Sequence, residues 1–423
     1  MQETPATRVT GRRRGRIGDC SVAARWPRRG GLAPALSVRR AGVTLGLAGC
    51  VLGGAAAPLS GLSPAAAAAG PRDGWSIVAS PNGSRVDNTL VGVSAGSATS
   101  AWAVGYDGGA GAFRTLTERW NGSAWAVVPS PSPSQLDNVL TGVATASPTS
   151  AWAVGYAVRG YHRALIEHWD GSAWRVVPSP RAGRLDSDLW GVTALSPANA
   201  WAVGNENIGG FRFRPLIEHW NGTAWTLVPA PSPPLRGVGA SLSSVAATSP
   251  RDIWAVGNYD TGTRFHRFQP LIEHWNGARW SIVPAPVPGS AQLSQISLRA
   301  PDDGWAVGIR GAPPSTQALI EHWDGHRWTE VSSPVITGSS LAGVLALTPH
   351  LAWAVGNYPL PHGGFRTLIE RWNGRAWTVT PSPNRDRSSE LLGIAGTQQH
   401  IWSVGDSLAS GGTPLTSTLI LRH

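Results

Sequence analysis

Short apolar segments alternate with polar turn residues along most of this chain, and their order repeats. In the second unit these segments are 138–144, 151–156, 163–169 and 173–178. Each is five to seven residues long, is rich in β-branched or aromatic residues, and is bounded by Gly, Pro, Asn, Asp or Ser. This pattern is typical of β-strands joined by turns. The unit therefore predicts four short strands.

The second predicted strand begins with Trp-Ala-Val-Gly or a near variant, which recurs at intervals of 48 to 53 residues. The seven phrases begin at Trp102, Trp152, Trp201, Trp254, Trp305, Trp353 and Trp402. A period near fifty is typical of arrays in which each repeat is one small sheet, and such a sheet must stack on its neighbours to bury its apolar faces. We therefore predict an all-β, seven-bladed β-propeller with four antiparallel strands per blade.

The two ends of the repeat region predict how the ring closes. The seventh unit stops at 419–423, in the place of its third strand. The missing fourth-strand pattern stands before the first unit, at 73–78. We expect this N-terminal strand to complete the last blade, so that residues 73–423 form one domain and residues 1–72 form a leader.

The turns after the third strands have a common composition. Asn-Gly or Asp-Gly follows the third strand at Asn121, Asp170, Asn221, Asn276, Asp324 and Asn373. These pairs accept the positive φ values of two-residue hairpins, so we predict such hairpins here. Pro closes each fourth strand, at Pro178 for example, which suits an outer edge where unpaired N–H groups invite aggregation.

These features carry a resemblance to a known family. A second strand ending in Gly155, a third strand ending in a turn, and Trp174 soon after it resemble the kelch-type propellers, including the central domain of galactose oxidase. The chain has one Gly where kelch units typically have two, and Trp-Asn-Gly where many have Tyr-Asp. The resemblance implies a propeller fold over 73–423. Galactose-oxidase chemistry needs a Tyr cross-linked to a Cys beside copper, and both cysteines, Cys20 and Cys50, precede the repeats. We expect no copper site, no other metal site and no cofactor.

The leader holds most of the net charge. Residues 1–72 contain eleven Arg against two acidic residues, whereas 73–423 contain 24 Arg against 23 acidic residues. Nucleic-acid binding requires a basic footprint on the folded domain, so we expect no nucleic-acid partner. A composition heavy in Ala, Gly, Pro and Arg is typical of a GC-rich, bacterial genome.

The leader also predicts export. Arg39-Arg40 precede an apolar run to Ala57, and Ala-rich sequence follows to Ala69, as in a secretory signal. Cleavage among 65–69 is favoured because the run stays apolar past Cys50. Leu-Ala-Gly-Cys at 47–50 resembles a lipobox, which would make Cys50 a lipidated residue; an uncleaved anchor is the third alternative. All three place the repeats at the cell surface or outside the cell, with membrane contact only through the N-terminus.

Repeated polar and aromatic residues are interpreted as structural. The third strand reads Leu-Ile-Glu-His-Trp in four units, at Glu167-His168 for example. Glu and His are metal-binding and acid–base residues, but adjacent strand residues point to opposite faces and different blades cannot converge. We expect the Glu to bind a neighbouring Arg or backbone N–H between blades. The Trp that recur in every blade are expected in the core, and Trp190 stands outside the pattern.

The candidate binding residues lie between the second-strand glycine and the third strand, on loops that share one face with the inter-blade connectors. They are Tyr106, Phe113, Arg114, Tyr161, His162, Arg163, Phe211, Phe213, Arg214, Tyr259, Phe265, His266, Arg267, Phe268, Tyr358, Phe365 and Arg366. Aromatic residues with Arg on variable loops are typical of recognition surfaces. The alternative is that they seal the loops onto the blades.

Acidic residues begin the inner strands on the same face: Asp87, Asp137, Asp186, Asp188 and Glu390. They could ring the channel mouth and hold a cation or a substrate hydroxyl, although Asp is also common at turns and strand starts. We predict a monomeric binding or scaffold module for a glycan, an envelope component or a protein. The alternatives are a hydrolase or lyase that uses the channel-mouth acids, and a structural surface protein with no specific ligand.

Overall fold

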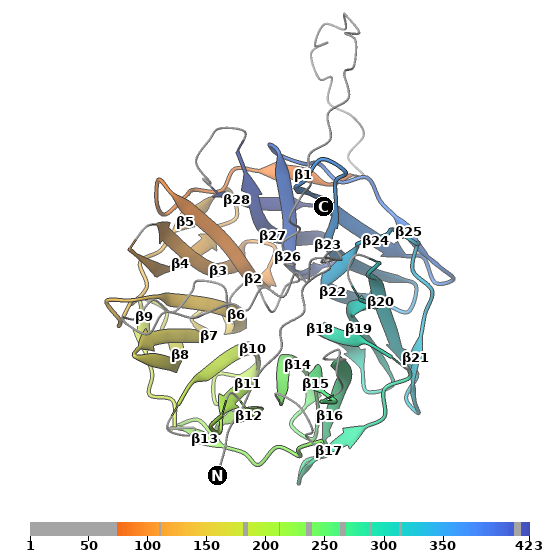
Figure 1. Cartoon of the computed structure of the whole chain (residues 1–423). Helices are drawn as coiled ribbons and strands as arrows, with labels where there is room; N and C mark the ends of the chain where they lie inside the picture. Colours follow the sequence, from red (N-terminus) through yellow and green to blue (C-terminus); the bar gives the residue numbers. More distant parts are fainter. Residues whose placement is uncertain are drawn as a thin grey trace, which may run out of the picture. The chain divides into compact units, whose positions relative to one another are not determined.

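The computed structural model describes residues 74–109, 111–180, 185–210, 212–233, 239–262, 268–287, 289–312, 315–409 and 416–423. They form seven four-stranded sheets, which Figure 1 shows as blades around a common axis. The prediction of an all-β, seven-bladed propeller is confirmed. Nothing in the described part of the chain is a helix long and apolar enough to cross a membrane.

Each blade has the same strand order from the axis outward, and we number the blades 1 to 7 by their inner strands. The inner strands are β2 (Asp87–Ser97), β6 (Asn138–Ser147), β10 (Ser187–Ser196), β14 (Ala240–Ser249), β18 (Ala291–Ala300), β22 (Ser340–Thr348) and β26 (Ser388–Thr397). The second strands are β3 (Ser100–Gly109), β7 (Ser150–Arg159), β11 (Asn199–Asn207), β15 (Asp252–Asp260), β19 (Asp303–Arg310), β23 (Leu351–Pro359) and β27 (His400–Leu408).

The outer half of each blade is a longer third strand and a short fourth strand. The third strands are β4 (Ala112–Trp120), β8 (Tyr161–Trp169), β12 (Phe213–Trp220), β16 (Phe268–Trp275), β20 (Gln317–Trp323), β24 (Phe365–Trp372) and β28 (Thr416–Arg422). The fourth strands are β5 (Trp125–Val127), β9 (Trp174–Val176), β13 (Trp225–Leu227), β17 (Trp280–Val283), β21 (Trp328–Glu330), β25 (Trp377–Val379) and, for blade 7, β1 (Ser76–Val78).

Strand β1 closes the ring, as the sequence predicts. It pairs antiparallel with β28, with Ile77 opposite Leu421. The preceding Trp75 is buried, with its ring centroid 5.4 Å from that of Trp353 in blade 6 and 5.3 Å from that of His423. The first described strand therefore supplies both the edge of blade 7 and a contact to blade 6.

The recurring glycine of the second strands has a steric cause. Each inner strand has a bulge just after a buried leucine, where the register with the second strand shifts by one residue. Next to the bulge, the inner-strand backbone lies against the glycine. A Cβ placed on Gly155 would lie 1.9 Å from the carbonyl oxygen of Val139, and the same distance is 1.9–2.1 Å in all seven blades. Only glycine fits this close approach.

The recurring tryptophans pack between blades. Trp152 of β7 contacts Trp220 and Trp225 of blade 3, at ring-centroid distances of 4.8 and 5.1 Å. The same three-ring contact joins the other neighbouring blades. Between blades 6 and 7, His423 takes the place of the third-strand tryptophan. These rings pack in the core, and the interpretation of the recurring tryptophans as core residues is confirmed.

The predicted two-residue hairpins are wrong. Trp169 pairs with Trp174, so four residues form the turn, and among them Gly171 alone has a positive φ, of 95°. The side chain of Asp170 accepts hydrogen bonds from the backbone N–H groups of Ser172 and Ala173, both at 2.9 Å. An Asx side chain that satisfies two amides stabilises this wider turn. The Asn-Gly and Asp-Gly pairs are therefore capping motifs.

The second and third strands are longer than the pattern predicts. In blade 2, β7 continues to Arg159 and β8 begins at Tyr161, so Gly160, with a φ of 80°, is the whole connection. Val158 pairs with His162 in this extension. Many residues assigned to loops are thus at strand ends, because the ladder continues until a glycine allows the chain to reverse.

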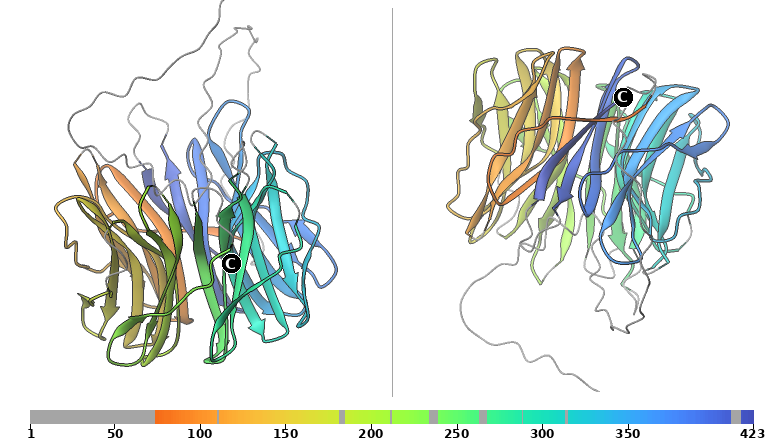
Figure 2. Two further views of the ribbon diagram at one scale, coloured as in Figure 1. Left: turned by 60° about the horizontal axis from the view of Figure 1, so that its bottom comes forward. Right: turned by 90° about the horizontal axis from the view of Figure 1, so that it is seen from above.

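The strands join two different faces. We call the loop face the one with the second-to-third-strand junctions and the connectors into the inner strands, and the turn face the opposite one. Figure 2 shows the strands crossing the ring between these faces. The fourth strands form the outer rim.

Candidate binding site on the loop face

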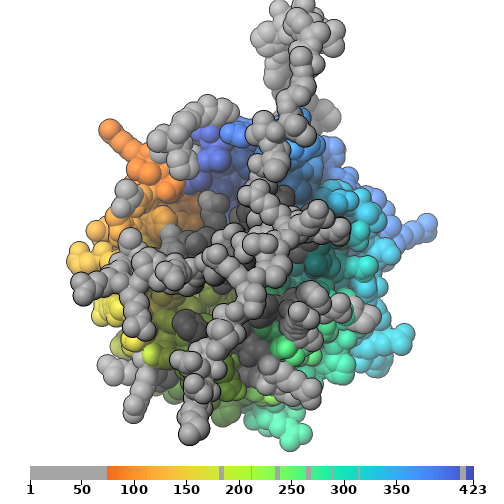
Figure 3. All heavy atoms as spheres, viewed as in Figure 1, coloured from red at the N-terminus to blue at the C-terminus, as the bar shows by residue number. Residues whose placement is uncertain are grey.

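Exposed apolar side chains gather at two places. Ten large ones are exposed among the described residues. Five stand at one repeated position of the fourth strands: Val127, Val176, Leu227, Ile282 and Val379. The fourth strands lie along the outer edge of the ring, which Figure 3 shows in a space-filling view from the direction of Figure 1. The other five are on the loop face: Val86, Leu136, Tyr161, Ile208 and Val335. Val86 and Leu136 share one repeat position before the inner strand, whereas the other three share none. Because this exposure differs from blade to blade, the loop face is the better candidate for recognition.

The charges of the loop face are distributed unevenly. Its exposed arginines among the described residues are Arg85, Arg114, Arg159, Arg212, Arg214 and Arg387. The acidic residues there are mostly buried or half-buried; the exposed ones are Asp386 and Glu330, and Glu330 forms an ion pair with Arg310. Burial raises the pKa of the Asp107 carboxyl, although the charge of Arg114 acts to lower it. The accessible charge on this face is therefore mainly positive.

The predicted aromatic residues fall into packed and accessible groups. Tyr259 and Tyr358 pack against apolar clusters between blades, which fits the alternative that such residues seal the blades. Tyr161, by contrast, is 48% exposed, and the guanidinium of Arg163 lies 5.8 Å from its ring centroid. The other predicted residues that the structure describes range from half-buried to exposed.

Other members occupy strand ends. Tyr106 and Phe113 contact each other in blade 1 at a ring-centroid distance of 4.7 Å. Phe213 forms a β-bridge with Gly239, and the exposed Arg214 holds the buried Glu206 at 2.6 Å. Half-buried in the same region are Phe268, Phe365 and Arg366. Four predicted residues lie outside the described residues: Phe211, Phe265, His266 and Arg267.

The strand-start acids bind neighbouring blades. Asp137 accepts a hydrogen bond from the backbone N–H of Phe113, and Asp186 accepts one from the backbone N–H of His162, both at 3.0 Å. In each case the donor is the second residue of the third strand of the preceding blade. Asp87 is 3.5 Å from the hydroxyl of Thr416, which begins β28. These contacts match the structural interpretation of the acids.

Three of these acids contact three different neighbouring blades. Asp87, Asp137 and Glu390 have different partners, since Glu390 accepts a hydrogen bond from Asn357 of blade 6 at 3.2 Å. Within the described ranges, no three His, Cys, Asp or Glu side chains are placed to hold a metal ion.

A belt of paired residues surrounds the axis just inside the loop face. In each blade the residue before the inner-strand leucine pairs with the residue after the second-strand glycine. We call these pairs the axial belt: Thr89–Tyr106, Val139–Tyr156, Asp188–Asn205, Ser241–Asn258, Gln292–Ile309, Ser340–Asn357 and Glu390–Asp406. Hydrogen bonds join neighbouring blades along it: Ser241 to Asn205 at 2.9 Å, Asn357 to Glu390 at 3.2 Å, and Thr89 to Asp406 at 2.9 Å.

Sequence reasoning found only part of this belt. It named Asp188 and Glu390 but not Asn205 or Asp406. A signal was present, because the residue after the nearly constant Trp-Ala-Val-Gly phrase reads Tyr, Tyr, Asn, Asn, Ile, Asn and Asp in successive units. A position that varies next to a constant phrase is the kind of place where a repeat scaffold carries its specificity.

The densest part of the belt is where blades 2 and 3 meet. We call Tyr156, His162, Asp188, Trp190 and Asn205 the blade 2–3 cluster. The Nδ1 of His162 lies 2.8 Å from a carboxylate oxygen of Asp188, and its ring stacks on Tyr156 with a centroid distance of 4.4 Å and parallel planes. Asp188 is 6% exposed, whereas the His162 side chain is 19% exposed. The imidazole is thus fixed from two sides and still reaches solvent.

Trp190 belongs to the same network. Its indole N–H donates to the side-chain oxygen of Asn205 at 2.6 Å, and the amide of Asn205 donates to Asp188 at 3.3 Å. The hydroxyl of Ser241 donates to the same Asn205 oxygen at 2.9 Å. Trp190 is half-buried, and its ring lies edge-on to that of Tyr156 at 6.2 Å.

Surrounding acids favour the charged form of His162. Burial lowers the pKa of its imidazole, but the hydrogen bond to Asp188 and the charges of Asp188, Asp186 and Asp137 outweigh burial. The pKa of His162 is therefore raised above its ordinary value. The cluster combines aromatic surface, a carboxylate, an amide and a titratable imidazole.

The repeated Glu-His pairs are structural, but the predicted partner of the Glu is wrong. The six third-strand glutamates are fully buried. Three accept hydrogen bonds from serines of the preceding connector rather than from Arg: Glu118 from Ser80 at 3.0 Å, Glu218 from Ser179 at 2.9 Å, and Glu370 from Ser333 at 3.0 Å. Both carboxyl oxygens of Glu167, Glu273 and Glu321 have no partner. The histidines stack instead on the tryptophan of their own blade, as His168 does on Trp152 at 4.3 Å.

These buried carboxyls predict a pH-dependent stability. Burial raises the pKa of Glu273 and Glu321 to about 8 from an ordinary 4.5. The folded state then keeps protons that the unfolded state releases, so the free energy of unfolding is highest below the unfolded pKa and falls as the pH rises toward about 8. Urea denaturation at several pH values between these limits measures the slope.

A natural substitution supplies the control for this prediction. Blade 7 has Leu421 where the other blades have Glu, so Glu273→Leu is expected to fold and to flatten the pH dependence. Asp302→Asn, which changes an exposed carboxyl away from these glutamates, should leave it as it is. Stability that rises with pH over the same interval contradicts the assignment.

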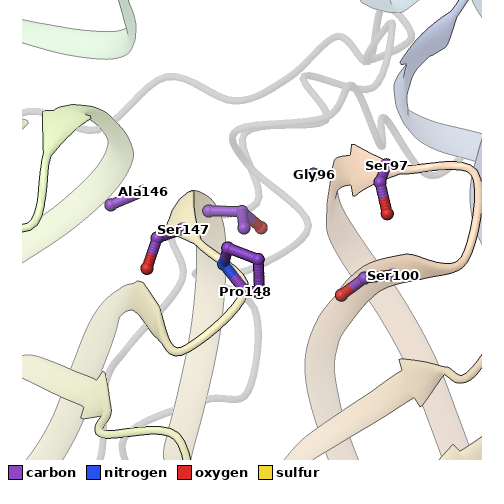
Figure 4. A pocket seen from close by; sticks show the side chains of 7 residues that line it. Gly96, Ser97, Ser100, Ala146, Ser147 and Pro148 are labelled. Carbon is purple, nitrogen blue, oxygen red and sulfur yellow. The ribbon is translucent and has the colours of Figure 1, made fainter.

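The turn face has one small depression between blades 1 and 2, which Figure 4 shows. Its lining includes Ser97 and Ser100 of blade 1 and Ser147 and Pro148 of blade 2, and its volume is about 90 Å³. The lining contains no charged or aromatic side chain. It offers little for recognition compared with the loop face.

No family model matches this chain, and no curated protein matches it. Solved structures do resemble it. "YCF48 bound to D1 peptide" is 14% identical, covers 84% of this chain and 97% of its own length, and has a TM-score of 0.52. The GH74 xyloglucanase from Xanthomonas campestris is 15% identical, with a TM-score of 0.51, over 81% of this chain and 55% of its own.

A third similar structure is an ulvan lyase of polysaccharide lyase family PL25 bound to a GlcA(1-4)Rha3S unit. It is 10% identical, covers 79% of this chain and 93% of its own, and has a TM-score of 0.52. At such identities these likenesses show the propeller fold, and fold alone does not determine function. The particular resemblance to kelch-type units and galactose oxidase finds no support among them. The chain is a seven-bladed β-propeller.

Proposed function

We propose that this protein is an exported binding module that recognises an acidic glycan of the cell envelope or its surroundings through the loop face of blades 1 to 3. The observation that carries the proposal is the distribution of exposed side chains. Four of the five exposed apolar residues of the loop face belong to these blades or their connectors: Val86, Leu136, Tyr161 and Ile208. The repeated tryptophans, glycines and glutamates of the blades are accounted for by packing, whereas these exposed side chains are not.

The exposed arginines support an acidic ligand. Five of the six lie beside the same blades: Arg85, Arg114, Arg159, Arg212 and Arg214. Guanidinium groups bind carboxylates and sulfates by paired hydrogen bonds, and apolar or aromatic neighbours bind the faces of sugar rings. Among similar structures, the ulvan lyase is bound to a unit containing GlcA, whereas YCF48 is bound to a peptide. An acidic peptide is therefore the competing ligand class that the experiment must separate.

The export part of the proposal depends on the leader, which lies outside the described residues. Cleavage among 65–69 is our preferred maturation, with lipidation at Cys50 as the alternative. Mass spectrometry of the mature chain from its native producer separates them, because only the lipoprotein would begin at a modified Cys50. A chain that keeps its N-terminus and remains in the cytoplasm contradicts export.

The loop face predicts where substitutions weaken binding. We expect the double variant Leu136→Ser with Tyr161→Ser to lower the affinity for ulvan or polygalacturonate by about ten-fold or more, since each exposed apolar contact contributes ~1 kcal/mol. Affinity electrophoresis and calorimetry with these polymers, with dextran as the uncharged comparison and polyglutamate as the acidic peptide, provide the measurement.

The rim supplies a matched control. Leu227 and Val379 are 46% and 48% exposed, close to the 50% and 48% of Leu136 and Tyr161. Leu227→Ser with Val379→Ser removes similar exposed surface away from the loop face and should leave affinity unchanged. Equal losses in both double variants, or binding of polyglutamate alone, would contradict the proposal.

A second candidate function is polysaccharide cleavage by a hydrolase or lyase. The observation that favours it is His162, which is bonded to Asp188 and close enough to Asp137 and Asp186 for their charges to raise its pKa. A histidine held by a carboxylate is a usual general acid or base. Incubation with ulvan, polygalacturonate and xyloglucan, followed by assays for reducing ends and for unsaturated products, tests this. Polymers that stay intact while still bound favour the binding module.

A further inference from the structure

Trp190 is the one aromatic residue at its repeat position among the seven blades. It occupies the bulge of the inner strand, between Leu189 and Gly191. The other blades have small or aliphatic residues there: Val91, Thr141, Ser243, Ser294, Ala342 and Leu392. The fold therefore does not require an aromatic side chain at this position. A bulky ring retained at one bulge needs a cause beyond packing of the blade.

The surroundings of Trp190 hold it in one orientation. Its indole N–H is bonded to Asn205, and Asn205 is itself held by Asp188 and by Ser241 of the next blade. Tyr156 of the preceding blade lies edge-on to the indole. Residues of three blades therefore hold the half-buried indole of Trp190 in place, in the part of the loop face nearest the axis. Side chains locked by a second set of contacts are typical of preorganised binding sites.

The polar atoms beside the ring suit hydroxyl groups. The carboxylate of Asp188 is 6% exposed and is bonded to Asn205 and to His162, whose imidazole is partly exposed. Neighbouring Glu206 is held by Arg214 at 2.6 Å. A flat aromatic face flanked by a carboxylate and an imidazole can pack against the C–H face of a sugar ring while bonding its hydroxyls. Six of the seven axial positions lack this combination.

We propose that the blade 2–3 cluster is a subsite for a single sugar ring, in which Trp190 packs against the ring and Asp188 and His162 bind its hydroxyls. This inference rests on the proposed function and names where one residue of the glycan sits. The exposed Arg and apolar residues of the loop face then contact the remainder of the chain. The subsite exists because blade 3 has a tryptophan where the other blades have small or aliphatic residues.

The test uses the ring itself as a reporter. The full chain is labelled with 5-fluorotryptophan, and the resonance of Trp190 is assigned by its loss in Trp190→Leu. That variant carries the leucine that blade 7 has at Leu392, so the fold is expected to persist. Titration with ulvan or polygalacturonate oligosaccharides should shift the Trp190 resonance, and Trp190→Leu should weaken binding roughly ten-fold, as loss of one well-packed aromatic contact does.

The outcomes separate this inference from the function on which it rests. Leu392→Ala, at the same position of blade 7, serves as the control and should bind as the parent does. If oligosaccharides bind and Leu136→Ser with Tyr161→Ser weakens them, but Trp190 neither shifts nor matters, the subsite is wrong and the binding module stands. If no polymer binds the parent chain, both are overturned. Should Trp190→Leu lose its dispersed fluorine spectrum, His162→Gln, which removes one hydrogen-bonding group, must lower affinity instead.

Discussion

Replacement of Gly155 by alanine is expected to destabilise the protein by ~3 kcal/mol or more. The added Cβ would lie 1.9 Å from the carbonyl oxygen of Val139 and 2.9 Å from the Cα of Leu140. Both atoms are backbone, held by the inner-strand bulge, so neither can rotate away as a flexible side chain could. The clash must displace the inner strand, and with it the contact to the next blade. Urea denaturation followed by tryptophan fluorescence gives the loss directly.

A second glycine provides the comparison. A Cβ on Gly111 meets no atom within 4 Å, and Gly111 is not among the residues with positive φ. Gly111→Ala should therefore change stability by no more than about 0.5 kcal/mol. Equal effects at the two positions would show that the close approach at Gly155 is relieved at little cost, and our explanation of the recurring glycine would fail.

Removal of the closing strand is the other large effect. A variant lacking residues 73–79 loses β1 and the buried Trp75, whose packing against Trp353 and His423 joins blades 6 and 7. Truncation of a buried tryptophan typically costs ~3–5 kcal/mol. The deletion also leaves β28 as an unpaired edge, which is prone to pair with another chain. We expect a lower urea midpoint together with concentration-dependent association in size-exclusion chromatography with light scattering.

Two point substitutions in the deleted segment test which of its residues accounts for the loss of stability. Trp75→Ala should reproduce most of the stability loss with less association, since the strand can still pair. Ser76→Ala, at an exposed position of the same strand, should behave like the parent. A deletion variant that remains monomeric with an unchanged midpoint would mean that closure by β1 contributes nothing to the ring.

On the proposed function, stability and recognition depend on different residues in this molecule. The core repeats: the same glycine recurs in all seven blades, and the tryptophan triplet and the buried carboxyl each recur six times, because each blade must fit the next in the same way. The loop face of blades 1 to 3 departs from the repeat, as Tyr161 and Trp190 show. Substitutions there, unlike those at Gly155 or Trp75, should alter binding while leaving the denaturation midpoint nearly unchanged.

Ring closure and blade number could be read from the chain because they depend on local, periodic signals. Seven phrases, four strands per unit and a displaced fourth-strand pattern at Trp75 all follow from residue order. The turn after each third strand was assigned the wrong geometry. Asn-Gly suits both a two-residue hairpin and an Asx-capped turn of four residues, and the pairing of Trp169 with Trp174 decides between them.

The sequence by itself determined the all-β architecture, its closure and the face on which variable residues collect, because strand period, turn chemistry and repeat length are encoded between near neighbours. Only the tertiary structure decided which residues meet. Asp188, His162, Trp190 and Asn205 come from two blades and three strands, and their contacts depend on how adjacent blades are rotated about the axis. That rotation is set by packing of the whole ring, which no segment of the chain specifies alone.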